Sequence, residues 1–460
     1  MDNTLREKET AIFETLPIPR AVAALAVPTI ISQIIAMIYN LADTWYIGQT
    51  GNTDMLAAVT IAWPLFMLTT AMANLFGIGG GSSISRALGQ KDYNKAKQAS
   101  SFSFWTAIAV TLLFSAVVVC TRKHLLVLLG ADEATFAFSY DYLFWVVVIG
   151  GVPTVLNMLL AHLVRAVGES KQASIGMSLG GILNIILDPV FMFEWGLGLY
   201  VKGAAMATCL SNTIASCYLL RFIIKGKHSS VLSLSPKYFT LRRDVSTVVL
   251  STGIPSALQT FLVVVSNAVL NNLMSAYTTA AVAAVGIIKK ADIFPVHVVQ
   301  GLSNGVLPLM AYNYASSNRR RMNRVIRFSL IVSSIFTVIC LICYELFAPF
   351  IVSIFINDEV TIRYGASFMR LHSMAMPFLS VIFLLIAFFQ ATAQSKQAII
   401  ISLLRKGIID IPLMIVMDRL FPMLGIMIVQ PVMDFSCTVI ALVMFLSFTK
   451  RLRQQEIRGT

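Results

Sequence analysis

Five polar side chains stand in stretches that are otherwise apolar, and together they could bind and release a small cation. They are two acids, two amides and a hydroxyl: Asp43, Asp188, Asn40, Asn184 and Thr208. An ionisable side chain within an apolar layer usually faces a cavity or a partner and marks a working site. Burial and a neighbouring carboxylate both disfavour the charged form of an acid. We therefore expect at least one of the two carboxyl groups to gain and lose a proton near neutral pH.

The composition indicates that the elements holding these side chains cross a membrane. Of the 460 residues, 57% are hydrophobic and only 12% are charged, whereas soluble domains carry about 25% charged residues. A membrane-spanning helix needs roughly 20 mostly apolar residues. We predict an all-α polytopic membrane protein with twelve transmembrane helices, at 22–47, 56–81, 98–120, 141–163, 173–194, 201–223, 246–274, 280–311, 325–347, 364–389, 398–417 and 423–448.

The two halves of the chain resemble one another. Residues 170–173 and 395–398 share the tetrapeptide Ser-Lys-Gln-Ala, and each copy lies between two apolar stretches. Because six spans per half is an even number, we expect two pseudo-symmetric six-helix bundles with the same orientation, related by an axis along the membrane normal. The predicted parts are an N-terminal lobe at 1–223, a cytoplasmic linker at 224–245 and a C-terminal lobe at 246–460.

The Lys and Arg residues predict the orientation of the chain, because cationic loops stay on the cytoplasmic side. With both termini inside, and with residues at span ends counted with the adjoining loop, the inner segments hold 25 of the 35 Lys and Arg residues and the outer loops hold 5. We expect a multi-pass protein of the cell inner (plasma) membrane with both termini in the cytoplasm and no cleaved signal peptide. The net charge of +13 then reflects contact with anionic lipid and not with nucleic acid.

This orientation places the five polar side chains in one layer of the N-terminal lobe. Asp43 lies about one turn from the outer end of its span, and Asp188 and Thr208 lie at a comparable depth in theirs. Pro28 and Pro189 each remove a backbone hydrogen bond and would let their helices bend. A purely structural reading stays open, in which Asp43 caps its helix and the sequence Asp188-Pro189 forms a kink.

The C-terminal half carries a second set of charges within its spans. Lys406 and Asp410 are four residues apart and could pair on one helix face. Lys290 and Asp292 could complete a buried network with them, and Lys289 lies beside them. We expect this network to close a central cavity, with substrate contact as the alternative. The histidines in or beside the spans are not spaced as metal ligands, so no metal site is expected.

A central cavity would also need surfaces that adapt to many shapes, which Met and Phe side chains provide. The residues expected to contact substrate lie inward, near the acid cluster or opposite it: Gln33, Tyr39, Gln259, Asn267 and Asp292. The sequence contains no phosphate-binding Walker motif. An ion gradient is therefore the expected source of energy.

Five motifs spread over both halves are specific when they are taken together. They are Asn40-Leu-Ala-Asp-Thr-Trp-Tyr-Ile-Gly48 and the stretches at 77–89, 165–171, 184–189 and 308–314. These motifs resemble the signatures of the multidrug and toxic compound extrusion (MATE) family. The resemblance implies a two-lobed, twelve-helix antiporter that expels organic, often cationic and amphipathic, compounds in exchange for a cation.

The resemblance also implies where the coupling ion binds. In the proton-linked branch of the family the coupling site is the N-lobe cluster, which corresponds here to Asp43, Asn184, Asp188 and Thr208. The sodium-linked branch tends to use an acid in span seven. This chain has Asn267, Asn271 and Asn272 in that span and no carboxylate, and this departure favours protons over Na⁺.

The predicted function is a secondary active antiporter that exports organic, cationic amphipathic compounds in exchange for H⁺ or Na⁺ by alternating access. It would need no cofactor besides the coupling ion, would contact small organic substrates and membrane lipids but no nucleic acid, and would work as a monomer. The alternatives are a flippase for lipid-linked precursors, of the same broad superfamily, and a specific metabolite exporter. An enzyme is not expected, because no set of His, Asp and Glu residues shows catalytic spacing.

Overall fold

The computed structural model describes residues 11–225 and 231–459, and this part of the chain is almost entirely helical, with no β-strand. The N-terminal half contains α2 (Ile18–Gln49), α3 (Thr53–Gly89), α4 (Tyr93–Leu128), α5 (Phe136–Leu143), the π-helix η1 (Phe144–Ile149), α6 (Gly151–Ala166), α7 (Ser170–Met192) and α8 (Tyr200–Lys225). The short 3₁₀-helix η3 (Pro236–Tyr238) follows. The C-terminal half contains α9 (Arg243–Met274), α10 (Thr279–Ala315), α11 (Arg319–Ser353), α12 (Glu359–Ser373), α13 (Met376–Ala391), α14 (Ser395–Leu403), the π-helix η4 (Leu404–Ile408), α15 (Asp410–Leu420) and α16 (Leu424–Gly459).

These helices have the length and composition of membrane spans. Among the described residues, 8 helices are long and apolar enough to cross a membrane, or up to 10 if each of two bent pairs counts as one span. The bent pairs are α5–η1 with α6, and α12 with α13. Helix α10 and the run α14–η4–α15 lie in the same bundle and complete the predicted set of twelve. Each predicted span coincides with one of these, although several helices extend further into the loops.

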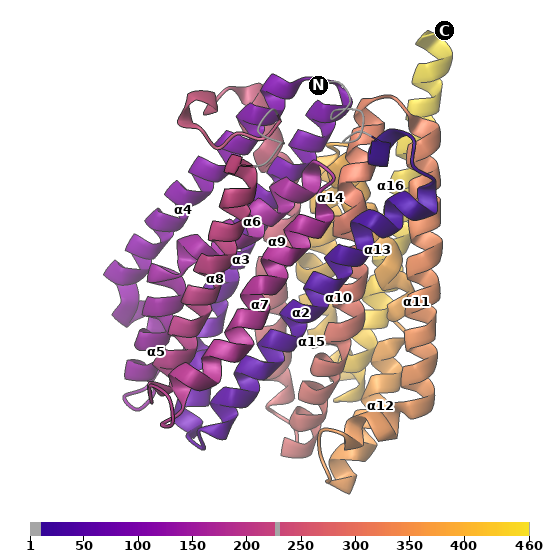
Figure 1. Cartoon of the computed structure of the whole chain (residues 1–460). Helices are drawn as coiled ribbons and strands as arrows, with labels where there is room; N and C mark the ends of the chain where they lie inside the picture. Colours follow the sequence, from indigo (N-terminus) through magenta and orange to yellow (C-terminus); the bar gives the residue numbers. More distant parts are fainter. Residues whose placement is uncertain (1–10, 226–230, 460) are drawn as a thin grey trace.

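Figure 1 shows two groups of helices side by side, which are the two predicted bundles. They meet where α3 packs against α9 and α2 packs against α10. Each contact joins the first span of one half to the second span of the other. The predicted lobe bounds, 1–223 and 246–460, stay a prediction. Residues 1–10 and part of the predicted linker, 224–245, lie outside the described residues.

The repeat seen in the sequence occupies equivalent places in the two lobes. Helix α7 begins at Ser170 and α14 begins at Ser395, which are the first residues of the two identical tetrapeptides. Both helices are the fifth span of their half. The repeated sequence therefore marks a repeated structural element.

The lobes approach most closely toward the end of the bundle where α2 begins and α16 ends, which we call the terminal face (Figure 1). A Cβ atom at Gly79 would lie 2.1 Å from the main-chain oxygen of Val249, and one at Gly253 would lie 1.8 Å from that of Leu75. Only glycine allows α3 and α9 to come this close, as at many helix crossings in membranes.

At the terminal face, the segment before α2 is hydrogen-bonded to helices of the C-terminal lobe. Nε of Arg321, on α11, donates to the main-chain oxygen of Phe13 at 2.6 Å, and Nη2 donates to that of Leu16 at 2.6 Å. The hydroxyl of Tyr312, on α10, donates to Oε1 of Glu14 at 2.5 Å. The C-terminal lobe therefore holds the chain at the entry to the first span.

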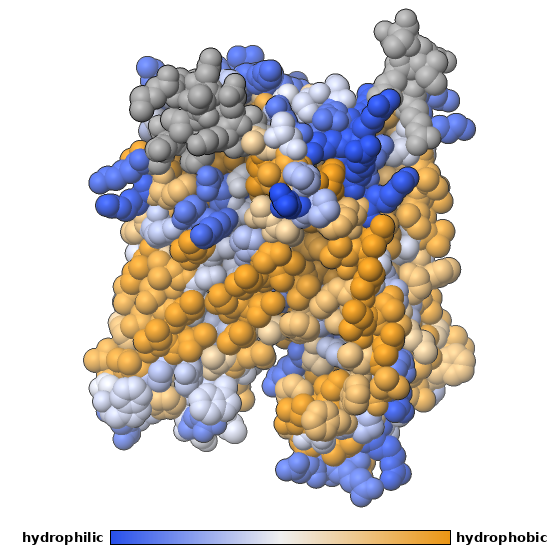
Figure 2. Space-filling model, turned by 45° about the vertical axis from the view of Figure 1, so that its right-hand side comes forward, coloured by the Kyte–Doolittle hydropathy of each residue, from blue (hydrophilic) through white to orange (hydrophobic). Residues whose placement is uncertain are grey.

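At the opposite face the lobes stand apart. Figure 2 shows a hollow between the two halves at the bottom of the molecule, below a broad apolar belt at mid-height and with polar residues concentrated at both ends. The belt is the surface expected to contact lipid hydrocarbon. The molecule is thus closed at the terminal face and open at the other.

Replacing Gly253 with Ala should loosen the terminal face, because the new methyl group would collide with the main-chain oxygen of Leu75. We expect a loss of about 1–3 kcal/mol, as is usual for overpacking, seen as a lower midpoint in thermal unfolding of the purified protein in detergent. Gly286→Ala is the matched control, since a Cβ atom there meets nothing within 4 Å. Equal midpoints for the two variants would contradict a structural need for this close approach.

Candidate functional site

Asp188, on α7, lies completely buried at the centre of the predicted acid cluster. Its Oδ1 accepts a hydrogen bond from Nδ2 of Asn184 at 2.9 Å, and the same Nδ2 donates to Oγ1 of Thr208, on α8, at 3.1 Å. The spacing of four residues puts Asn184 and Asp188 on one helix face, and the packing of α7 on α8 adds Thr208. The structure therefore brings these three predicted residues together.

Asp43 reaches the same cluster from α2, which packs against α7. Its carboxyl group and that of Asp188 are near enough to interact electrostatically. Two tyrosine hydroxyl groups, of Tyr39 on α2 and Tyr142 on α5, are also within electrostatic reach of both acids. Tyr142 was not predicted, because a tyrosine in an apolar stretch carries no charge that would single it out.

The cluster has unused capacity for hydrogen bonding. Within the described part of the chain, Oδ1 of Asp43, Oδ2 of Asp188 and Oδ1 of Asn184 are buried and have no hydrogen-bond partner. Buried polar atoms nearly always have one, and two neighbouring carboxylates in apolar surroundings repel each other. A proton or a small cation held between these oxygen atoms would relieve both problems.

Asn40 is placed differently from the other four cluster residues. It lines the central cavity, but its Nδ2 donates to the main-chain oxygen of Ala36, in its own helix, at 2.7 Å. The structure gives it no hydrogen bond to either acid. A role for Asn40 in holding the coupling ion stays a prediction.

A central cavity of about 990 Å³ lies between the lobes, at the upper end of the size usual for binding sites of small organic molecules. Asn184 and Thr208 line it, so the acid cluster adjoins the cavity while Asp188 itself is sealed from it. All five residues predicted to contact substrate line the cavity: Gln33, Tyr39, Gln259, Asn267 and Asp292. Trp63 and several Met side chains add adaptable apolar surface on the N-terminal wall.

The C-terminal wall of the cavity holds the predicted charge network. Nζ of Lys406 lies 3.7 Å from Oδ2 of Asp410, as their spacing predicts, and Asp410 also accepts a hydrogen bond from Ser266 at 2.6 Å. Gln430 accepts a hydrogen bond from Lys406 at 2.7 Å and donates one to Asp434 at 2.8 Å. The network is therefore built on α9, α16 and the segment from η4 to α15.

Asp434 is the functional candidate that sequence reasoning missed. It is 1% exposed and forms an ion pair with Arg405, whose Nε lies 2.9 Å from its Oδ1. An acid within the predicted span 423–448 carries the same signal that singled out Asp43. The network could therefore have been extended to Asp434 from the sequence.

The structure does not join Lys290 and Asp292 to Lys406 and Asp410 by ion pairs, or to each other, which corrects that part of the predicted network. Asp292 forms an ion pair with His372, on α12, and Lys290 has no ion pair among the described residues. The physical reason is geometric, since residues two apart on a helix do not face each other. The partner from α12 could not be foreseen without the fold.

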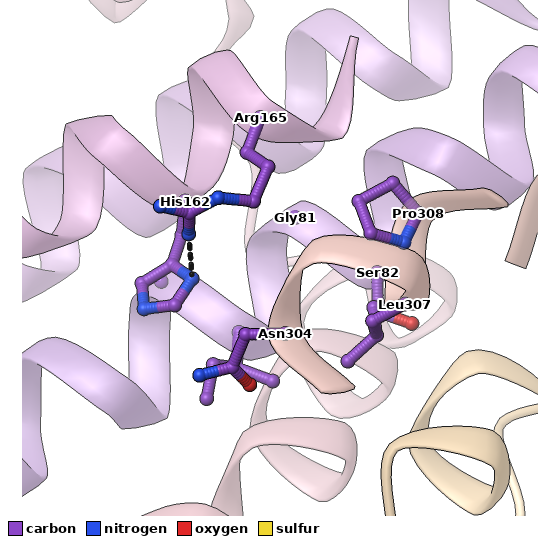
Figure 3. A pocket seen from close by; sticks show the side chains of 9 residues that line it. Gly81, Ser82, His162, Arg165, Asn304, Leu307 and Pro308 are labelled. Atoms are coloured by element: carbon purple, nitrogen blue, oxygen red, sulfur yellow. Dashed lines mark hydrogen bonds between the residues drawn. The ribbon is translucent and has the colours of Figure 1, made fainter. Parts of the chain in front are cut away.

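At its terminal end the cavity narrows to a small pocket, drawn in Figure 3. Nη1 of Arg165 lies 3.2 Å from Nδ1 of His162, and the dashed line in Figure 3 marks this contact. Asn304 and Pro308, on α10, line the other side. Nearby, Nη1 of Arg86 donates to the main-chain oxygen of Gln390 at 2.9 Å. The hydrogen bond from Arg86 to Gln390 joins the two lobes, and with the residues that line the small pocket from α6 and α10 it closes the cavity toward the terminal face.

Comparisons with known proteins agree with this architecture. The MatE family model matches residues 28–190 and, a second time, residues 255–416, which is once in each lobe. The multidrug export protein MepA of Staphylococcus aureus (strain MRSA252) is 30% identical over 448 residues, covering 97% of this chain and 98% of the relative. MepA of Staphylococcus saprophyticus is 29% identical with the same coverage.

Solved structures show the same fold. A multidrug resistance MATE family transporter in an outward-facing conformation has a TM-score of 0.87 at 22% identity, covering 98% of this chain and 99% of that one. A crystal structure of MATE in complex with MaL6 has a TM-score of 0.88 at 21% identity with the same coverage. These likenesses confirm the predicted two-lobed, twelve-helix fold.

The relatives also decide between broad classes of protein. The curated relatives are named for export and not for catalysis, so the prediction that the chain is not an enzyme is confirmed. The solved structure in the outward-facing conformation is named a transporter, and the apolar spans found here are those of a membrane protein. The double match to the family model and the relatives that span nearly the whole chain show that this multi-pass membrane protein belongs to the multidrug and toxic compound extrusion (MATE) family.

Proposed function

We propose that this protein is an antiporter that exports organic compounds from the cell in exchange for H⁺, by alternating access. The observation that carries the proposal is the pair Asp43 and Asp188. Both acids have buried oxygen atoms without a partner among the described residues, and they adjoin a cavity between lobes that stand apart at one face (Figure 2). Relatives named multidrug export proteins support organic compounds as the cargo.

The acid pair can drive a conformational change because its charge differs between two states. A ligand shifts an equilibrium only by its differential interaction with the two conformations. With both acids charged, closing apolar helices around them is unfavourable, and a bound proton removes part of that cost. Proton entry down 100 mV releases about 2.3 kcal/mol, which corresponds to roughly a fifty-fold gradient of exported compound.

The partners of the other acids around the cavity support the N-terminal pair as the site of the coupling ion. Asp410 and Asp434 lie within ion-pair distance of Lys406 and Arg405, and Asp292 lies against the imidazole of His372. Span seven supplies only amides, at Asn267, Asn271 and Asn272. The N-terminal pair is therefore the place where an added cation would meet uncompensated negative charge, and Na⁺ at this same pair is the alternative.

The remaining features of the proposal follow from the cavity and the loops. One chain contains the whole cavity and both lobes, so a monomer suffices, and no cofactor is needed besides the coupling ion. The expected contacts are small amphipathic organic substrates and membrane lipids. The excess of Lys and Arg in the loops at the terminal face supports an orientation with both termini in the cytoplasm, and the membrane would be the inner (plasma) membrane.

A flippase for lipid-linked precursors is the second candidate, and one observation favours it. Lys289 and Lys290 give the cavity cationic groups that could hold a phosphate. Proton flux stimulated by drug-like compounds in proteoliposomes would support the antiporter. Flux stimulated only by a lipid-linked precursor would support the flippase.

Replacing either acid should remove coupled export. In Asp43→Asn and Asp188→Asn an amide replaces the group that exchanges the proton. We expect export of ethidium, in cells stripped of their own efflux pumps, to fall about tenfold or more, since one charge moved through 100 mV is worth about 2.3 kcal/mol. Asp54→Asn is the matched control, because Asp54 is exposed at the start of α3. Export at the wild-type rate by both cluster variants would mean that the coupling site lies elsewhere.

The driving ion can be identified in everted membrane vesicles. Adding a transported compound should dissipate an imposed pH gradient, and replacing Na⁺ with choline should leave the transport rate unchanged, because the proposed site exchanges protons. A rate that collapses in choline and recovers with Na⁺ would reject H⁺ as the coupling ion. Vesicles carrying Asp188→Asn provide the background.

A further inference from the structure

The C-terminal wall of the cavity holds more positive charge than its acids neutralise. Two of the three acids on this wall lie against a Lys or Arg side chain, in the pairs Asp434–Arg405 and Asp410–Lys406, and Asp292 lies against the imidazole of His372. Two further cations, Lys289 and Lys290, line the same cavity. They have no carboxylate within ion-pair distance in the part of the chain that the structure describes.

The two lysines line the cavity, and no carboxylate nearby neutralises their positive charge. Nζ of Lys289 donates to Oδ1 of Asn271, on α9, at 3.0 Å, and its ammonium group is near enough to Lys406 for the two to repel each other. Lys290 has an exposed side chain on the next position of α10. Cations at membrane depth are unfavourable unless they pair or serve a ligand. This wall is therefore suited to a negatively charged group.

The N-terminal wall of the cavity, which faces these lysines, has acids behind it in place of cations. Apart from Arg165 and His162 at the sealed end, its polar lining is uncharged, with amides such as Asn157 and Asn212. Behind this lining lie the acids Asp43 and Asp188, with unpartnered oxygen atoms. A molecule that bridges the cavity would thus have these acids behind the wall at one end and ammonium groups in the wall at the other.

We propose that Lys289 and Lys290, together with the side-chain amide of Asn271, form a subsite for a carboxylate or a similar singly charged anionic group of the exported compound. The amide oxygen of Asn271 is engaged by Lys289, which leaves its NH₂ group to donate to the anion. The inference rests on the proposed export function and narrows the substrate class to zwitterionic amphiphiles, which are preferred over purely cationic ones.

The two ends of such a compound would have separate roles. Its anionic group, held by lysines, would set the affinity and the orientation in the cavity. Its cationic group, toward the N-terminal wall, would compete with the proton for the acid pair. A compound lacking the anionic group would still be displaced by the proton but would bind less tightly.

A matched pair of ligands tests the subsite directly. Norfloxacin has a carboxylate and an amine, and its ethyl ester keeps the amine but lacks the negative charge. Binding of each to the purified full-length protein in lipid nanodiscs can be followed by quinolone fluorescence at one fixed neutral pH. We expect the wild type to bind the acid about tenfold more tightly than the ester, the range of one charge-assisted contact.

Variants of Lys289 and Lys290 test whether these two residues cause the preference for the acid over the ester. In the double variant Lys289→Gln and Lys290→Gln, affinity for the acid should fall to that for the ester, while affinity for the ester stays within about twofold and so reports an intact cavity. Replacing both lysines with Arg should retain the preference. Lys171→Gln is the matched control, because Lys171 is exposed at the start of α7, away from the cavity lining.

Two results would overturn the subsite. One is a wild type that binds the ester as tightly as the acid, and the other is a double variant that keeps the preference. A transport assay of both compounds in proteoliposomes separates this inference from the proposed function. Preferential binding without export would reject the export function and keep the subsite, whereas export without any preference for the acid would reject the subsite alone.

Discussion

Two acids in an apolar layer, with buried oxygen atoms that nothing in the described chain satisfies, are the constraint on which the proposed mechanism depends. Asp188 has one hydrogen bond, from Asn184, and its other carboxyl oxygen has none. Asp43 approaches from a different helix and adds a second carboxyl group. Since buried polar atoms are rarely left unpaired, these oxygen atoms favour the proposed cation site over a purely structural role for the cluster.

Helix α2 connects this site to the closure between the lobes. Near its end it carries Asp43, and nearer its start it packs against α10, where a Cβ atom at Gly305 would lie 2.7 Å from Cα of Ala26. Pro28 lies between these two regions, and the helix continues through it. A proline in a helix removes one backbone hydrogen bond and eases bending. Protonation at one end of α2 therefore has a physical route to the contacts that hold the terminal face closed.

Much of the fold was predictable because spans and loops differ so strongly in composition. The spacing of Asn184 and Asp188 also fixed their shared helix face, and the four-residue step from Lys406 to Asp410 gave their pairing. Contacts between spans that are distant in the sequence were not predictable. Periodicity gives the face of a helix but not the neighbour that the face meets, so the ion pair of Asp292 with His372 and the approach of Tyr142 to the acids required the fold.

The protonation state of the acid pair is the quantity that tests the account most directly. Infrared difference spectroscopy of the purified protein in lipid, recorded on adding an exported compound at neutral pH, reports carboxyl groups that lose a proton. A proton shared by the pair would give a protonated-carboxyl band that disappears when the compound binds, and that is absent from both Asp43→Asn and Asp188→Asn. A spectrum without such a band in the wild type, or the same band in all three proteins, would contradict a proton shared by this pair.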